Sequence, residues 1–465
     1  MRLSTHQDKA DCVGTVSPGH MARRLGRHTL LAAALLAVIA GIRATPQTAD
    51  EDYRVYTDHP RIFLKAQRLR LLRRERERQS MRWEQFDALV RGGAPLREPG
   101  FALALYYEVS GDKPSGQRAI AWARTGTDLR QLAIVFDWCQ DLLDDNARHE
   151  LAARILRMAN GSAANDTAAV RDRALAAIAV AEQDKTASER ILTDLVRHWW
   201  RERTAPELTR GERIIAHDEL WALEELMHVI RDNLRIDLRD DARDYFMRLP
   251  LYEIASYYPA PLQGQENDYY IPASRQGEPD IGHAILSRVA DLSLVAYDNN
   301  AQESQYVQGW TMQDRFMLRD TLGAPYEFLW GNPYQPGLSY YQLPLAYYDP
   351  TSGALFLRSS WDDDAKWFGL VGTGMQLFEG GHMKPAGPNE GPIEIGNRQV
   401  VPAEKHLRFA TSGDATYIVG LPPRIPYLVE IDDEEMQELT SDPRGTLEFP
   451  SPKDRKLQVL LRAEK

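Results

Sequence analysis

The stretch Gly353–His382, GALFLRSSWDDDAKWFGLVGTGMQLFEGGH, decides the fold because its residue pattern is that of strands. Leu355 and Leu357 occupy alternate positions, and the acidic turn Asp362–Asp364 separates them from a second apolar run that begins at Trp367. Alternating segments bounded by Gly, Asp and Ser are typical of hairpins in an antiparallel sheet. The sequence therefore predicts a β part that begins near this stretch.

The chain before this stretch has a helical pattern. From Leu64 to about Leu322 it reads as consecutive helices, separated by short segments rich in Asp, Asn, Gly and Ser. The first of them, Leu64–Val90, is long, Arg-rich and amphipathic. At 465 residues the chain is too long for one ordinary core. We expect a helical domain followed by a β domain.

Three strings carry a family resemblance: FLRSSWDDDAKWFGL (356–370), HPRIFL (His59–Leu64) and LAIVFDWCQDLL (Leu132–Leu143). They resemble strings of heparinase II/III-like proteins, which are polysaccharide lyases and their relatives. The first string resembles the opening of their β domain, the second resembles the entry to their helical domain, and the third resembles their early helices. The resemblance implies an α+β multidomain fold. An N-terminal α/α toroid over residues 52–340 would precede one antiparallel β-sandwich over residues 341–465, of immunoglobulin-like size.

The N-terminal residues have the pattern of a leader. A basic segment, Arg23–His28, precedes the apolar run Thr29–Ile42. Basic residues before a short apolar run are typical of a secretory signal peptide, which we expect to end at residue 44. Met21 is the expected true start, so residues 1–20 would not belong to the natural protein. This pattern predicts a periplasmic or secreted protein.

Charge and motifs narrow the class of partner. The formal net charge of −11 argues against nucleic acid or an anionic membrane as partner. It also means that a polyanionic substrate would need a locally basic cleft. The sequence has no P-loop, no nucleophile-elbow motif and no zinc-protease motif. We expect no cofactor, and no membrane partner once the leader is removed.

Tyrosines are concentrated in the second half of the helical part. Fourteen of the 20 tyrosines lie between Tyr245 and Tyr348, and the loop Glu327–Gly337 is rich in aromatic residues for a linker. Glycan clefts use aromatic rings against the C–H faces of sugars, although these rings could equally pack the helices against the sheet. The predicted substrate-binding residues are Tyr258, Asn267, Tyr270, Arg275 and Trp330.

Cleavage of a uronate glycan by β-elimination sets the chemistry of a lyase site. A carboxylate must be neutralised, the C5 proton removed and the leaving oxygen protonated. His217 is the predicted neutraliser or base, and His228 follows eleven residues later, about three helical turns away on the same side. Either histidine could equally be a packed residue. The segment Gln263–Asp280 resembles the region that carries the family's catalytic Tyr, which makes Tyr269 the predicted acid.

The β part departs from the family pattern. In Gly380–Gly396, His382 matches the first histidine of the family's His-rich string, but Lys384 stands where the second would be. His382 is the third predicted catalytic residue. One histidine without partners cannot form a zinc site, so no metal is expected.

Three hypotheses for function remain open on the sequence. The first is a heparinase II/III-like polysaccharide lyase that acts on a uronate-containing polysaccharide or oligosaccharide. The second is a glycan-binding or scaffold protein that keeps the fold without the chemistry. The third, an inverting glycoside hydrolase, needs two carboxyl groups about 6.5–9.5 Å apart. Glu224, Glu225 or Glu266 could supply one of these groups, and no motif identifies the pair.

Overall fold

The structure is a computed structural model that describes most of the chain beyond residue 50. Residues Tyr53–Lys465 form one compact unit. The predicted signal peptide lies outside the described residues. Over the ranges that the structure describes, no helix is long and apolar enough to cross a membrane. These ranges are 51–162, 166–215, 217–263, 268–273, 281–313, 317–371, 374–386, 391–403, 407–411, 413–433, 435–450 and 456–463.

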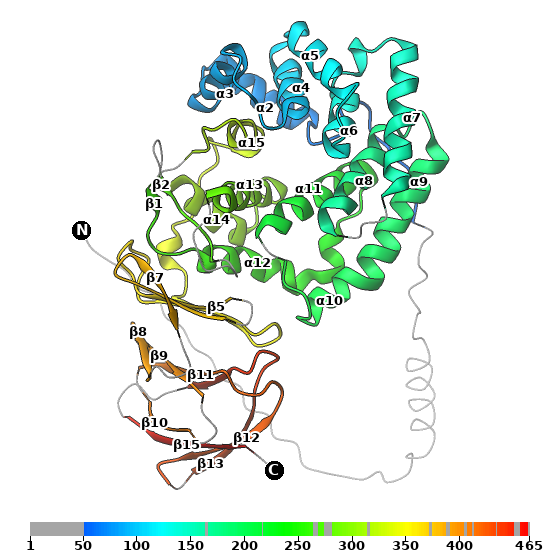
Figure 1. Ribbon diagram of the computed structural model, residues 1–465. Helices are drawn as coiled ribbons and strands as arrows, with labels where there is room; N and C mark the ends of the chain where they lie inside the picture. Colours follow the sequence, from blue (N-terminus) through cyan, green and yellow to red (C-terminus); the bar gives the residue numbers. More distant parts are fainter. Residues whose placement is uncertain are drawn as a thin grey trace, which may run out of the picture. The chain divides into compact units, whose positions relative to one another are not determined.

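Helices dominate the chain up to Trp330, as the sequence predicts (Figure 1). Several begin where an aspartate accepts a hydrogen bond from the backbone N–H three residues later, as Asp128, Asp144 and Asp166 do. The helices are α2 (Ala66–Glu77), α3 (Met81–Arg91), α4 (Pro99–Ser110), α5 (Lys113–Ala123), α6 (Leu129–Trp138), α7 (Asp145–Gly161), α8 (Thr167–Ala179), α9 (Lys185–Thr193), α10 (Ala205–Thr209), α11 (His217–Leu234), α12 (Arg243–Ser256), α13 (Ile281–Tyr297), α14 (Gln302–Gln313) and α15 (Gly323–Trp330). A π-helix, η2 (Asp194–Thr204), follows α9, and three short 3₁₀ segments are η1 (Gln140–Leu142), η3 (Leu238–Ala242) and η4 (Tyr340–Gln342).

The predicted long helix Leu64–Val90 is wrong in one respect, because it is two helices. α2 ends at Glu77, and Gln79 takes a positive φ of 49°. The hydroxyl of Ser80 then accepts a hydrogen bond from the N–H of Trp83 at 3.2 Å. A serine in this position caps a new helix, so the chain turns between α2 and α3.

The strands form three larger sheets and one small hairpin. The first sheet has the order β3-β4-β5-β6-β7, the second β14-β11-β9-β8, and the third β10-β15-β12-β13, with β1 and β2 paired separately. The strands are β1 (Leu262–Gln263), β2 (Asp268–Tyr269), β3 (Ala346–Asp349), β4 (Ala354–Arg358), β5 (Trp367–Val371), β6 (Gly374–Glu379), β7 (His382–Ala386), β8 (Ile393–Ile395), β9 (Arg398–Pro402), β10 (Leu407–Ala410), β11 (Ala415–Val419), β12 (Pro426–Ile431), β13 (Glu435–Thr440), β14 (Leu447–Pro450) and β15 (Gln458–Ala463).

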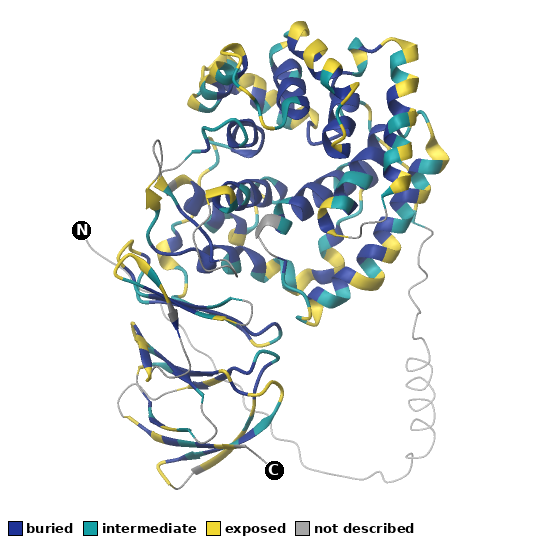
Figure 2. Ribbon diagram, viewed as in Figure 1, coloured by how far each residue is buried: buried dark blue, intermediate teal, exposed yellow. Residues whose placement is uncertain are grey.

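The first sheet packs against the helices, the second sheet packs against the first, and the third packs against the second. In the first sheet, Phe356 packs with Ala255 of α12, whereas its neighbour Leu357 packs with Val400 of the second sheet. The next residue, Val401, packs into the cluster shared with the third sheet. Successive side chains of a strand point to opposite faces, so each of the first two sheets is covered on both sides. Figure 2 shows buried residues along their strands.

The structure therefore differs from the single antiparallel sandwich that the sequence predicts. Three stacked sheets take its place, and β9 pairs with β11 in parallel. A sheet that is covered on both faces tolerates parallel pairing and continuous apolar runs, which is why Val400 and Val401 are both buried. The change from helix to sheet falls between Trp330 and Ala346, apart from the two-residue strands β1 and β2.

The helices and the first sheet meet through aromatic side chains. The indole Nε1 of Trp367 donates to the backbone carbonyl of Ala255 at 2.9 Å. The hydroxyl of Tyr258 donates to Gln376 Oε1 at 2.8 Å, and its ring stacks on Phe378 with centroids 5.6 Å apart. Part of the tyrosine-rich segment thus packs the helices against the sheet, which was the alternative interpretation of these residues.

A buried ion-pair network crosses the helical part. The carboxylate of Glu225 accepts from Arg130 Nη2 at 2.6 Å and from Arg171 Nη1 at 3.1 Å. Its side chain is fully buried. Glu225 is therefore engaged in the core, and Glu266 lies outside the described residues.

Glu224, the neighbouring residue on α11, leads to a pH prediction. Burial raises its pKa from 4.5 to about 8, against the opposing charge of Arg239 and with the added repulsion of Glu253. Between these two values the folded state binds more protons than the unfolded chain, so stability falls as pH rises. Glu224→Gln keeps the shape of the protonated carboxyl and should remove this loss. The difference in unfolding free energy between variant and wild type should grow by roughly 1.4 kcal/mol per pH unit.

Denaturant unfolding of both proteins at several pH values across this window checks the prediction. Other titrating groups are common to the two proteins, so their contributions largely cancel in the difference. Parallel stability curves for wild type and Glu224→Gln would contradict it.

Candidate functional site

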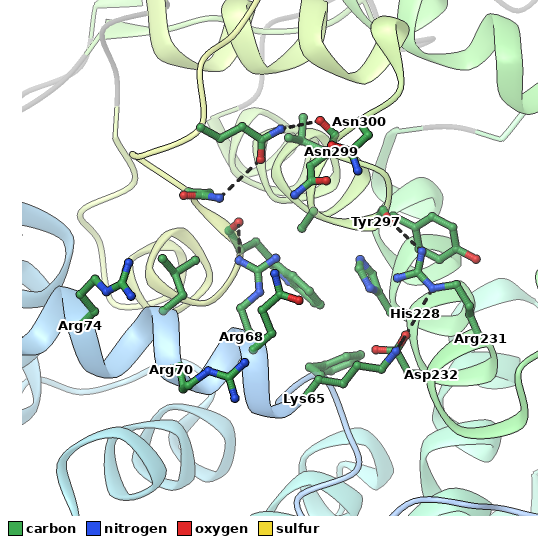
Figure 3. Close-up of a pocket in the computed structure, with 18 residues that line it drawn as sticks. Lys65, Arg68, Arg70, Arg74, His228, Arg231, Asp232, Tyr297, Asn299 and Asn300 are labelled. Carbon is green, nitrogen blue, oxygen red and sulfur yellow. Dashed lines mark hydrogen bonds and ion pairs between the residues drawn. The ribbon is translucent and has the colours of Figure 1, made fainter.

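A pocket of about 650 Å³ lies between α2 and the C-terminal ends of α11, α13 and α15 (Figure 3). Among the described residues that line it, cations predominate and one carboxylate is present, that of Asp232. The cations come from two segments that are far apart in the sequence, namely α2 with the residue before it, and α11. They are Lys65, Arg68, Arg70, Arg74 and Arg231.

Trp330, the last residue of α15, forms part of the pocket wall and is 2% exposed. The His228 ring stacks on its indole with centroids 4.6 Å apart. The guanidinium carbon of Arg68 lies 5.7 Å from the indole centroid, and Arg68 Nη1 donates to the Trp330 carbonyl at 3.4 Å. These contacts hold a cation and an imidazole against one aromatic side chain.

His228 is held as a neutral imidazole. Its Nε2 lies 3.0 Å from the carbonyl oxygen of Ser293. A carbonyl can only accept, so this hydrogen bond assigns the proton to Nε2 and leaves a lone pair on Nδ1. Burial keeps the pKa of His228 well below its usual value, although the bond to Ser293 acts in the opposite direction. The pocket therefore contains an uncharged histidine with an acceptor nitrogen.

Arg231 has a fixed orientation in the pocket. Its guanidinium carbon lies 3.6 Å from the ring centroid of Tyr297, and Nη1 donates to the Tyr297 carbonyl at 2.6 Å. Its Nε is 3.3 Å from Asp232 Oδ1, the same oxygen that Lys65 Nζ approaches to 2.5 Å. Figure 3 shows Arg231 and Lys65 on either side of Asp232. An arginine restrained in this way loses little entropy when it binds an anion.

The charge in the pocket is not balanced by its own residues. Burial lowers the pKa of Arg68 to about 10, which still leaves it protonated at neutral pH. Arg70 and Arg74, one helical turn apart on α2, are exposed at the pocket. No ion pair of either residue is found in the described part of the chain. Five cations around one carboxylate favour an anionic ligand.

Among the predicted substrate-binding residues, Trp330 lines this pocket. Tyr258 lies at the junction of α12 with the first sheet and is 3% exposed. The hydroxyl of Tyr270 donates to Asp363 Oδ1 at 3.1 Å, and its ring contacts Trp310 edge to face. Asn267 and Arg275 lie outside the described residues. The roles of all five residues in substrate binding stay predictions.

The predicted catalytic residues lie on three different elements. His217 is the first residue of α11, and its side chain is outside the described structure. His228 is about 16 Å further along this helix at 1.5 Å per residue, so the pocket is not at the His217 end. Tyr269 is half-buried on β2, where it pairs with Leu262. His382 is exposed at the turn between β6 and β7.

Sequence reasoning missed the five cations of the pocket. Four of them belong to the segment Leu64–Val90, whose Arg-rich composition was visible. That signal alone could not distinguish a pocket wall from a solvated helix face. Within the described residues, no group of three or more His, Cys, Asp or Glu side chains is placed to hold a metal ion.

Comparisons with known proteins give distant likenesses. No family model and no curated protein sequence matches the chain. Heparan sulfate lyase HepC from Pedobacter heparinus is 12% identical over 78% of this chain and 75% of that chain, with a TM-score of 0.36. A glycoside hydrolase is 7% identical over 79% and 71%, with a TM-score of 0.31. The β-arabinofuranosidase BT3674 of GH127 is 10% identical over 89% and 80%, with a TM-score of 0.22. At these TM-scores the likenesses carry no argument about function.

Proposed function

We propose that the protein binds an acidic polysaccharide or oligosaccharide through the basic pocket. The carrying observation is the concentration of five cations around Trp330 and Tyr297 in a chain of net charge −11. Guanidinium groups pair with carboxylate or sulfate oxygens through two parallel hydrogen bonds. In a protein of negative net charge, an acidic ligand needs a locally basic cleft, and this pocket has that property.

We further propose that the bound glycan is a uronate polymer and that it is cleaved by β-elimination, as in heparinase II/III-like lyases. The pocket contains two of the required kinds of group. Arg68 and Arg231 can neutralise a carboxylate, and the Nδ1 lone pair of His228 can accept a proton. The predicted contributions of His217, Tyr269 and His382, and the toroidal arrangement of the helices, belong to this proposal.

A specific observation favours the second hypothesis, glycan binding without catalysis. Tyr297 lines the pocket, and its hydroxyl donates a hydrogen bond to Asp237 Oδ1 at 2.9 Å. A group engaged in this way is a poor proton donor for a leaving oxygen. Export by the predicted leader, which would bring the protein to extracellular glycans, is likewise part of the proposed function.

An absorbance assay separates the lyase from the binding protein. Elimination creates a C4–C5 double bond in the uronate product, which absorbs in the near ultraviolet. A lyase should therefore raise the absorbance of a uronate polysaccharide without any added cofactor. Tyr269→Phe should abolish this increase and leave glycan binding within about threefold, because only the hydroxyl is lost.

Binding measured on the same panel of polysaccharides supplies the control. Saturable binding without an absorbance change would exclude the lyase and retain the glycan-binding protein. Absence of both signals from the whole panel would contradict the proposed function.

A further inference from the structure

Arg358 is a charged residue in an otherwise largely apolar face of the first sheet. It ends β4 and pairs with Trp367 of β5. Residues two apart on a strand share a face, so Arg358 lies on the same side as Phe356, which packs against the helices. The guanidinium therefore belongs to the junction between the helices and the first sheet, away from the basic pocket.

Within the part of the chain that the structure describes, the charge of Arg358 has no counterion. The residue is 3% exposed, and its Nε and Nη1 are buried without a hydrogen-bond partner. No ion pair of Arg358 occurs among the described residues, and burial lowers its pKa to about 9. Its contact is with the Trp361 ring, whose centroid is 4.1 Å from the guanidinium carbon. A buried ion without a partner is strongly unfavourable.

The chain pairs other deeply buried arginines with carboxylates. Arg288 Nε lies 2.8 Å from Glu327 Oε2, and Arg130 is paired with Glu225. Both arginines are buried to the same extent as Arg358. Arg358 is therefore an exception among these buried arginines. An anionic group from outside the chain would offset the free-energy cost of burying its charge.

Aromatic rings connect Arg358 to the surface. The rings of Trp361 and Tyr340 meet edge to face, with centroids 5.6 Å apart. The ring of Tyr340 in turn stacks on that of Tyr341, with centroids 4.7 Å apart. Tyr341 is 53% exposed, so the cluster reaches solvent there. Aromatic rings next to a guanidinium offer a ligand both an apolar face and a positive charge.

We propose that Arg358 binds the carboxylate of a ligand at the junction between the helices and the first sheet. A carboxylate has one negative charge and a planar pair of oxygens that match the guanidinium donors. Two sources share this chemistry: a sugar acid, whose ring would lie against Tyr340 and Tyr341, and a small organic acid. The inference does not depend on the pocket. It relies on the proposed function only for the choice of a sugar acid as probe.

Thermal unfolding of Arg358→Met tests the proposal. Methionine keeps much of the apolar stem and removes the charge, so the variant should unfold at a higher temperature than wild type in buffer without carboxylates. Sodium glucuronate should raise the unfolding temperature of wild type in a concentration-dependent manner. The variant should lose this shift when both proteins also carry Arg68→Gln and Arg231→Gln, which remove the response of the basic pocket to the same probe. Glucose, which has the same ring without the acid, should give no shift in either protein.

Acetate distinguishes the two sources of carboxylate. A shift with both acetate and glucuronate identifies a general carboxylate site, and a shift with glucuronate alone identifies a sugar-acid site. Either result supports the proposal, provided that Arg358→Met removes the shift. Arg358→Gln, a second neutral variant, should behave in the same way. Arg358→Lys, which keeps the charge, should retain part of the response.

Two control variants, Arg288→Met and Arg231→Gln, show which results would contradict the proposal. Arg288→Met removes an arginine that has a carboxylate partner, so it should lower the unfolding temperature. Destabilisation by both Arg358→Met and Arg358→Gln, similar to that of Arg288→Met, would overturn the proposal, as would a glucuronate shift that survives in them. Arg231→Gln in the pocket should keep the glucuronate shift at Arg358. Failure of polysaccharide binding at the pocket can thus be told apart from failure at this site.

Discussion

Arg231→Gln is expected to weaken binding of an acidic oligosaccharide by about thirtyfold, which corresponds to roughly 2 kcal/mol. The side chain is held against Tyr297 and Asp232, so an anion that enters the pocket would pair with it without a large ordering cost. Glutamine keeps hydrogen-bonding capacity and loses the charge. Isothermal titration calorimetry at low ionic strength measures the difference in Kd.

Arg118→Gln is the matched control for this prediction. Arg118 is exposed on α5 and is not among the residues of the pocket, yet its replacement changes the net charge by the same amount. Its effect on Kd should be less than about twofold, because an exposed charge outside the pocket interacts with the ligand only through solvent of high dielectric constant. Equal losses in the two variants would mean that only the total charge of the protein matters.

Glu225→Ala should cause the largest loss of stability, about 3–5 kcal/mol. The substitution removes the carboxylate that Arg130 and Arg171 share and leaves both guanidinium groups buried. Glu225→Gln, which preserves the side-chain volume, should lose nearly as much, since the missing charge is the main cause. Urea unfolding, with the midpoint and slope fitted together, measures the change.

Glu150→Ala serves as the control for Glu225→Ala. Glu150 is exposed on α7, and its removal should change stability by less than about 0.5 kcal/mol. A loss below about 1 kcal/mol in Glu225→Ala would show that the two arginines do not depend on this carboxylate. Binding of acidic oligosaccharides to folded Glu225→Ala should remain, because Glu225 is not a pocket residue.

Local patterns predicted the succession of helices and the first strands, but not the break between α2 and α3. Helical periodicity and aspartate caps such as Asp128 depend on neighbouring residues, and so does the alternation around Leu355 and Leu357. The stacking of three sheets depends on long-range pairing. A run such as Val400–Val401 shows that both faces of a strand are buried, but it does not show which sheets cover them. The parallel pairing of β9 with β11 was hidden for the same reason.

The candidate site was only partly readable from the sequence. Trp330 was predicted because the segment Glu327–Gly337, expected to be a loop, is rich in aromatic residues; Trp330 ends α15 instead, and it lines the pocket. Arg68 and Arg231 meet only because the end of α11 lies beside α2, which no local pattern encodes. Sequence spacing put His217 and His228 on one side of a helix, but it could not tell which end of that helix reaches the pocket. The unpaired state of Arg358 is likewise a property of tertiary packing.

Calorimetric titration with an acidic oligosaccharide and its carboxyl-reduced, neutral counterpart tests the central claim most directly. The account predicts that the acidic form binds at least about tenfold more tightly at low salt and that this advantage shrinks as ionic strength rises. The same advantage should be lost in the double variant Arg68→Gln, Arg231→Gln. Equal affinity for the acidic and neutral forms, or a preference unaffected by salt and by the double variant, would contradict the assignment of the basic pocket as the site of acidic-glycan binding.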